Sequence, residues 1–197
     1  MEKTLFIASA LAVLMPTGFC LSCYQCTINE QYKCVGAYKL CAKKEVCFTA
    51  FATTAQSGPF VVGRICATAN KCDQSFSYLI NGQKATISTS CCKTNKCKPA
   101  PQVKKNALKC PFCVADESGS CIADQTYECT GPEDKCFSYY SAGPRKQLLA
   151  RGCASSNICN TPLKNTIVPP VYQNGKAICE DEESDQTDDA GDEDDSR

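Results

Sequence analysis

The stretch Cys23-Tyr24-Gln25-Cys26 returns 87 residues later as Cys110-Pro111-Phe112-Cys113, and each copy opens a ladder of cysteines. In the first ladder, residues 23–97, the gaps between successive cysteines hold 2, 7, 6, 5, 18, 5 and 18 residues, followed by an adjacent pair and a gap of 4. The second ladder, residues 110–179, has gaps of 2, 7, 7, 6, 16, 5 and 19. Loop lengths drift unless each cysteine has a fixed geometric role, so the agreement predicts one duplicated disulfide module.

The N-terminus carries a short apolar run at residues 5–15, preceded by Lys3. A membrane-spanning helix needs about 20 apolar residues, so the run is typical of a secretory signal peptide. Cleavage at residue 20 removes one of the 19 cysteines and leaves no odd thiol, which supports a signal peptide at residues 1–20. A bacterial lipoprotein signal at Cys20 is the competing interpretation, but Phe19 stands where that signal needs a small residue. Because the acidic C-terminus offers no hydrophobic tail for a lipid anchor, we expect a secreted, extracellular protein without a membrane anchor.

Each module spans about 75 to 80 residues, a size at which small secreted domains depend on disulfides for stability. Zinc binding and thioredoxin-like redox chemistry are the alternative interpretations of the two Cys-x-x-Cys motifs. The chain has no histidine, and both motifs stand inside an all-cysteine ladder behind a signal for an oxidising compartment. We therefore expect structural disulfides, with no metal and no cofactor.

Short runs rich in Val, Ile, Thr, Phe and Tyr lie between the cysteines, broken by Gly, Pro and Asn, which is typical of strands and turns. Residues 78–80 and 85–87 flank Asn81-Gly82, a pair that tolerates the positive φ angles of a tight hairpin turn. The second module repeats this signal at Asn174-Gly175. Two longer hairpins are predicted, at 46–54 returning through 60–67 and at 137–140 returning through 148–151, with Gly58-Pro59 and Gly143-Pro144 at their tips.

The opening Leu21-Ser22-Cys23-Tyr24-Gln25-Cys26, the ladder, and the close Cys91-Cys92-Lys93-Thr94-Asn95-Lys96-Cys97 resemble the three-finger domain of the urokinase-receptor and lymphocyte-antigen (Ly6) superfamily. The resemblance covers both modules. It implies a small disulfide-rich all-β fold of two tandem three-finger, or snake-toxin-like, domains. We place these domains at residues 21–98 and 107–179, joined by a linker at 99–106 and followed by an acidic, disordered tail at 180–197.

The resemblance also implies the disulfide pairing, which spacing alone cannot choose. The implied bridges of the first module are Cys23 to Cys47, Cys26 to Cys34, Cys41 to Cys66, Cys72 to Cys91 and Cys92 to Cys97. Those of the second are Cys110 to Cys136, Cys113 to Cys121, Cys129 to Cys153 and Cys159 to Cys179. Two departures from the family pattern stand out. Lys98 occupies the position where family domains commonly place an asparagine, so a hydrogen bond at the base of the domain is expected to be missing, and the second module lacks the final adjacent pair.

A tandem pair with a trimmed second member, carrying Cys129-Thr130-Gly131-Pro132-Glu133-Asp134-Lys135-Cys136 and Gly152-Cys153-Ala154-Ser155-Ser156, is similar to the gamma-type phospholipase A2 inhibitors. That resemblance implies a secreted antagonist that binds a secreted phospholipase A2, often as a homo-oligomer. Sodefrin precursor-like factors share the same plan. They imply the alternative, a pheromone-like signal or receptor modulator that acts through a cell-surface receptor.

The chain is formally neutral, but its acidic and basic residues are distributed very unevenly. Residues 180–197 contain eleven acidic side chains and one basic, whereas residues 21–179 contain nineteen basic and nine acidic. Lysines cluster at Lys39, Lys43 and Lys44 and again at Lys93, Lys96 and Lys98. The tail is interpreted either as a solubilising segment, or as one that folds back on the basic first module or binds a cationic partner. Nucleic acid is not an expected partner of a secreted disulfide protein.

Enzyme chemistry is not expected, because the chain lacks histidine, the commonest general base. The carboxylate pairs Asp116-Glu117 and Glu133-Asp134 lie in predicted solvated loops, so no catalytic residue is assigned. Disulfide-clamped hairpins present rigid loops that lose little entropy on association, so a protein-binding module is favoured. The candidate partner-binding tips are Gln56, Ser57, Gly58, Pro59 and Phe60 in the first module and Gly143, Pro144, Arg145 and Lys146 in the second. Phe60 is either an apolar anchor or a core-facing aromatic, and alternation predicts that only one of Tyr139 and Tyr140 points inward.

Overall fold

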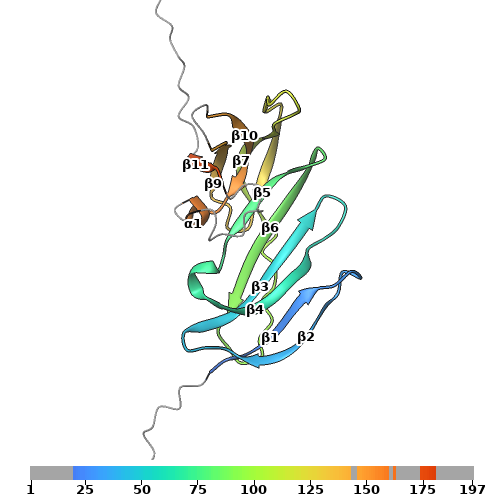
Figure 1. Cartoon of the computed structure of the whole chain (residues 1–197), viewed down its shortest axis with the longest axis vertical. Coiled ribbons are helices and arrows are strands. Elements are labelled where there is room, and N and C mark those ends of the chain that lie inside the picture. The colour runs from blue at the N-terminus through green and yellow to red at the C-terminus, as the bar shows by residue number, and fades with distance from the viewer. Residues whose placement is uncertain (1–19, 143–145, 160–161, 163–173, 181–197) are drawn as a thin grey trace, which may run out of the picture.

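A computed structural model describes residues 20–142, 146–159, 162 and 174–180, and it consists almost entirely of β-strands (Figure 1). The fold is the small disulfide-rich all-β class that the sequence predicts. The expected signal peptide up to residue 19 and the acidic residues 181–197 lie outside the described residues.

The first module contains three antiparallel hairpins. The strands are β1 (Ser22–Ile28), β2 (Cys34–Leu40), β3 (Glu45–Thr54), β4 (Phe60–Thr68), β5 (Ser75–Ile80) and β6 (Gln83–Cys92), with a 3-10 turn at Ala69–Lys71. The hairpin predicted from Asn81-Gly82 is confirmed: Asn81 has φ 50° and Gly82 has φ 73°, so both adopt the left-handed conformation that a tight primed turn requires. In Figure 1 the tips of the three hairpins follow one another along the right-hand edge of the molecule.

The second module repeats the first two hairpins. Its strands are β7 (Lys105–Val114), β8 (Gln125–Thr130), β9 (Lys135–Tyr140), β10 (Leu148–Ala154) and β11 (Lys176–Glu180), with one short helix, α1 (Ser156–Cys159). The turn predicted at Asn174-Gly175 precedes β11 directly, but the strand expected before it lies outside the described residues. Within the described part of the chain, no helix is long and apolar enough to cross a membrane.

The two modules share one sheet. The strand order is β11-β9-β10-β5-β6-β3-β4-β1-β2, with β7 and β8 branching from β10. The connection between modules is the antiparallel pairing of β5 with β10, in which Ser77 lies opposite Cys153 and Phe76 opposite Ala154. Because the third hairpin of the first module joins the second hairpin of the next, hydrogen-bonded backbone runs across the boundary between the modules.

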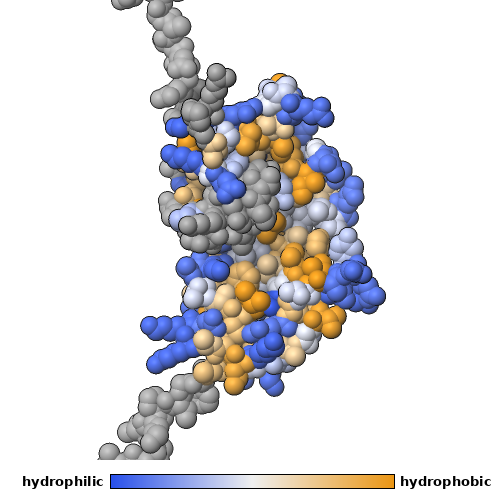
Figure 2. All heavy atoms as spheres, in the orientation of Figure 1, coloured by the Kyte–Doolittle hydropathy of each residue, from blue (hydrophilic) through white to orange (hydrophobic). Residues whose placement is uncertain are grey.

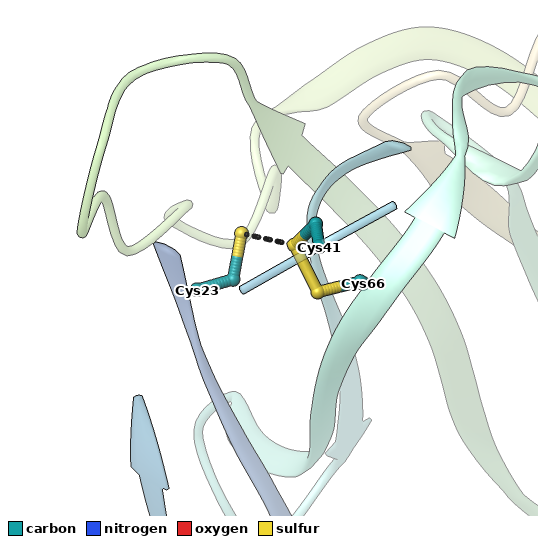
Figure 3. A group of neighbouring side chains, drawn as sticks. All are labelled: Cys23, Cys41 and Cys66. Atoms are coloured by element: carbon teal, nitrogen blue, oxygen red, sulfur yellow. Dashed lines mark hydrogen bonds between the residues drawn. A yellow bond between two sulfur atoms is a disulfide. The ribbon is translucent and has the colours of Figure 1, made fainter. Parts of the chain in front are cut away.

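The disulfides form the core of each module's base. The structure contains nine, and they are the same nine pairs that the family resemblance implies. In the first module the buried Cys23, Cys41 and Cys47 pack together, and the Cys23 and Cys41 sulfur atoms lie 3.1 Å apart, so two disulfides touch (Figure 3). Sulfur thus occupies the volume that larger apolar side chains fill in a bigger domain.

A hydrogen bond closes the base of the first module, although Lys98 stands at the usual asparagine position. The Oδ1 atom of Asn95 accepts a hydrogen bond of 2.8 Å from the backbone N–H of Ser22, and the N–H of Lys96 donates to the Ser22 carbonyl, also at 2.8 Å. Asn95, inside the last disulfide loop, thus supplies a side-chain hydrogen bond at this base, although residue 98 is a lysine.

Candidate functional site

The junction of the two modules holds a buried carboxylate. Glu133 was expected in a solvated loop, and this is wrong: it is fully buried, whereas its neighbour Asp134 is exposed. The Glu133 carboxylate accepts a hydrogen bond of 3.0 Å from the Ser75 hydroxyl and another from the Ser77 hydroxyl, both on β5 of the first module. On its own module it accepts bonds from the backbone N–H of Thr130 at 2.7 Å and from the Thr130 hydroxyl at 3.2 Å. Glu133 is buried because strand β5 of the first module covers the turn that carries it.

Lys84 provides the positive charge at this junction. Its Nζ atom lies 3.7 Å from the Glu133 carboxylate and donates a 2.6 Å hydrogen bond to the backbone carbonyl of Glu128. It also lies 5.7 Å from the centre of the Phe112 ring, within reach of a cation–π contact. Burial lowers the pKa of Lys84, an effect that the Glu133 charge opposes. One lysine of the first module therefore contacts three residues of the second.

Backbone and apolar contacts extend the junction on either side of Glu133. The hydroxyl of Ser155 accepts a 2.9 Å bond from the N–H of Ser75, and the N–H of Ser155 donates to the Ser75 carbonyl at 2.9 Å. The rings of Phe76 and Phe137 lie 4.4 Å apart, one from each module. A Cβ atom on Gly152 would collide with the backbone of β5 and with the Phe137 ring, so glycine permits the close approach of β10. Together these contacts favour two modules that bind partners as a single body.

A cavity of about 320 Å³ opens beside this junction. Its walls come from strands of the first module, from the linker and from β8, and they include Thr86, Val103, Lys105 and Tyr127. Lys105 forms a 2.7 Å ion pair with Glu128 at the rim, and this pairing lowers the pKa of the glutamate. The cavity has the size of a small-ligand pocket, but the charged groups at its rim already have partners.

The predicted tip of the first module lies where the sequence placed it. Gln56, Ser57, Gly58 and Pro59 are exposed in the loop between β3 and β4, and Phe60 is half-buried at the start of β4. Phe60 is thus neither a fully exposed anchor nor a core residue. The loop presents polar and small side chains over a rigid two-stranded support.

The corresponding tip of the second module is described only in part. Gly143, Pro144 and Arg145 lie outside the described residues, while Lys146 is exposed and lines a shallow cavity of about 290 Å³ with Tyr140 and Lys176. The prediction that only one of the adjacent tyrosines points inward is confirmed. Tyr139 is buried at 3% exposure, and Tyr140 is half-buried.

A basic and aromatic surface lies at the other end of the sheet, on β1, β2 and the last disulfide loop. We call it the tyrosine–lysine patch, and it consists of Tyr24, Tyr38, Lys96 and Lys98. The two rings meet edge to face, with centroids 5.3 Å apart. Lys96 Nζ lies 5.7 Å from the Tyr38 ring and Lys98 Nζ lies 5.7 Å from the Tyr24 ring. Exposed apolar side chains continue along β2, where Val35 is 67% and Leu40 is 75% exposed.

Figure 2 shows hydrophobic side chains on this face over both the lower part of the molecule, where the first module lies, and the upper part, with hydrophilic side chains mainly along the edges. An apolar centre with a polar rim is the composition of many protein-binding surfaces. This favours a protein as the partner of this face.

The other reactive side chains of the described residues have structural roles. The Asp116 carboxylate accepts hydrogen bonds from the N–H and hydroxyl of Ser118 and from the N–H of Ser120; these bonds lower its pKa and close a turn. Cysteine sulfurs approach one another in threes, as at Cys23, Cys41 and Cys66 (Figure 3), but each is in a disulfide and none is a thiolate ligand. Among the described residues the free cysteine is the exposed Cys20.

Sequence reasoning missed both the buried junction and the tyrosine–lysine patch. The spacing Thr130-x-x-Glu133 resembles a local cap, and Ser75 and Ser77 alternate on one face of a strand, yet neither signal points to a distant module. Lys96 and Lys98 were noticed only as charges. Their tyrosine partners come from another hairpin, so only the fold brings them together.

Two stretches of the chain, residues 20–100 and 106–184, each match the family model of the u-PAR/Ly-6 domain. A search of curated proteins found no match to the chain.

Proposed function

Because the chain belongs to the u-PAR/Ly-6 domain family, we propose that it is a secreted protein that binds a secreted phospholipase A2 and blocks the enzyme's access to lipid. Domains of this family are typically non-enzymatic and bind other proteins outside the cell or at its surface. The observation that carries the finer proposal is the asymmetric disulfide plan, five bridges in the first module and four in the second. The cysteine ladder resembles that of the gamma-type phospholipase A2 inhibitors, which share this plan. The sodefrin precursor-like factors share it too, so binding to the enzyme decides between the two.

The geometry is compatible with steric blocking of a large partner. The β5–β10 pairing and the buried Glu133 hold the modules together, so their exposed loops move as one unit. A pre-organised surface loses little entropy when it binds, which favours tight association. Gln56 at the tip of the second hairpin and the exposed side chains of β2 are the first candidates for contact.

The test is a panel of immobilised acidic and basic secreted phospholipases, on which binding and lipid hydrolysis are both measured. We expect tight binding to at least one enzyme, with loss of its hydrolysis of aggregated lipid. Gln56→Arg places a bulky charge on the β3–β4 tip and should weaken this binding, whereas Gln83→Arg makes the same change at the exposed β5–β6 turn, away from β2, as a matched control. Absence of binding across the panel would reject the phospholipase proposal and favour a cell-surface receptor as the partner.

A further inference from the structure

The tyrosine–lysine patch presents two ammonium groups on one exposed surface. The Lys96 and Lys98 side chains are exposed, and each ammonium group lies 5.7 Å from a tyrosine ring. The Tyr24 hydroxyl is itself fixed, because it accepts a 3.0 Å hydrogen bond from the N–H of Gly36. The rings restrict the two charges to one surface without neutralising them, so a partner with several carboxylates loses less entropy on binding there.

Neither lysine of the patch has an acidic partner within the described part of the chain. The ion pairs there are Lys84 with Glu133 and Lys105 with Glu128, both at the module junction. The first module, residues 21–101, has ten basic and only three acidic residues. Among the residues that the structure describes, the positive charge of the patch is therefore uncompensated.

The segment that follows β11 has the complementary composition. Ten of the 17 residues in 181–197 are Asp or Glu. In the sheet order, β1 is seven strands from β11, which corresponds to about 34 Å at about 4.8 Å per strand. A segment of 17 residues spans up to about 56 Å when extended, so its length allows it to reach the patch within one molecule.

We propose that residues 181–197 bind the tyrosine–lysine patch of the same molecule and compete there with anionic partners. The acidic segment is thus an internal regulator of the basic surface. The contact is between exposed charges, so salt weakens it. It is independent of which protein the rest of the surface binds, and its failure would leave the phospholipase proposal intact.

Zero-length carbodiimide cross-linking of the full chain tests the contact directly, because the reagent joins only amines and carboxylates that touch. We expect the monomer fraction to show bonds from the segment's carboxylates to Lys96 and Lys98 in preference to Lys43 and Lys44, which lie in the loop between β2 and β3. Equal labelling of all four lysines would overturn the proposal. Cross-links found only in dimers would overturn it as well, because the acidic segment of a second molecule would then occupy the patch.

A second measurement tests the competition, with heparin as the anionic probe. Replacing the Asp and Glu residues of 181–197 by Asn and Gln in the full chain should raise heparin affinity about 5- to 30-fold at low salt, from the loss of two exposed ion pairs. The double variant Lys96→Gln with Lys98→Gln should abolish most of this gain, whereas Lys43→Gln with Lys44→Gln should preserve it. If the gain survives in the first double variant, or disappears equally in both, the patch is not the site.

Discussion

Replacing Glu133 tests the contact that unites the two modules. Its carboxylate is fully buried, accepts hydrogen bonds from four donors and faces the ammonium group of Lys84. Glu133→Gln keeps the shape of the side chain but removes the charge, and Glu133→Ala removes every acceptor. Both changes leave the Ser75 and Ser77 hydroxyls without their carboxylate partner.

The magnitude follows from the contacts. A hydrogen bond to a charged group contributes about 1.5–3 kcal/mol, and removing one partner of a buried ion pair costs about 3–5 kcal/mol. Lys84 keeps the Glu128 carbonyl as an acceptor at 2.6 Å, which limits the loss. We therefore expect Glu133→Gln to lower the free energy of unfolding by about 2–3 kcal/mol and Glu133→Ala to lower it by about 4 kcal/mol.

The assay is guanidinium unfolding of the oxidised protein, followed by far-ultraviolet circular dichroism and by tyrosine fluorescence, since the chain has no tryptophan. The wild type should unfold in one transition. Glu133→Ala should unfold in two transitions, because the two modules would then unfold separately. Glu117→Gln, an exposed glutamate of the same module, is the control and should have almost no effect. A loss below about 0.5 kcal/mol for Glu133→Gln, the range of ordinary surface substitutions, would refute the reasoning.

Three further changes test other parts of the structure. Gly152→Ala should destabilise the protein by about 1–3 kcal/mol in the same assay, because its Cβ meets the β5 backbone, whereas Gly58→Ala, with nothing within 4 Å, should not. Asn95→Ala should cost about 0.5–1.5 kcal/mol by removing the acceptor of the Ser22 N–H, and an unchanged unfolding midpoint would contradict that role. Burial raises the pKa of Tyr78 above its usual 10.0. As the pH rises past 10.0, the unfolded chain loses this proton before the folded one, so stability falls. In thermal melts over this pH range, Tyr78→Phe should show a smaller decrease of the melting temperature than the wild type.

The features that the sequence predicted are those with a local cause. Asn81-Gly82 encodes a hairpin turn by its own backbone preferences, and Gly58-Pro59 breaks the strands on either side of it. Alternation along β9 separates the buried Tyr139 from the half-buried Tyr140 for the same reason. The cysteine ladder fixes the register of the repeat, because each bridge has a required geometry.

The features that the sequence could not predict depend on contacts between modules. Gly131-Pro132-Glu133-Asp134 has the composition of an exposed turn, and Glu133 is buried only because β5 of the first module covers it. No sequence signal marks β5 and β10 as partners, since neither strand carries a motif that is specific for the other. The tyrosine–lysine patch likewise combines a hairpin with a distant disulfide loop.

Amide hydrogen exchange of the oxidised protein tests the central claim, that the two modules share one sheet and bind as one body. Without β10, β5 would pair only with β6 and would have a solvent-exposed edge, as β2 has beyond β1. The shared sheet predicts that peptides covering β5 exchange as slowly as the internal strand β3, and more slowly than β2. Exchange of β5 at the rate of β2 would show that the modules are separate, and the account would be wrong.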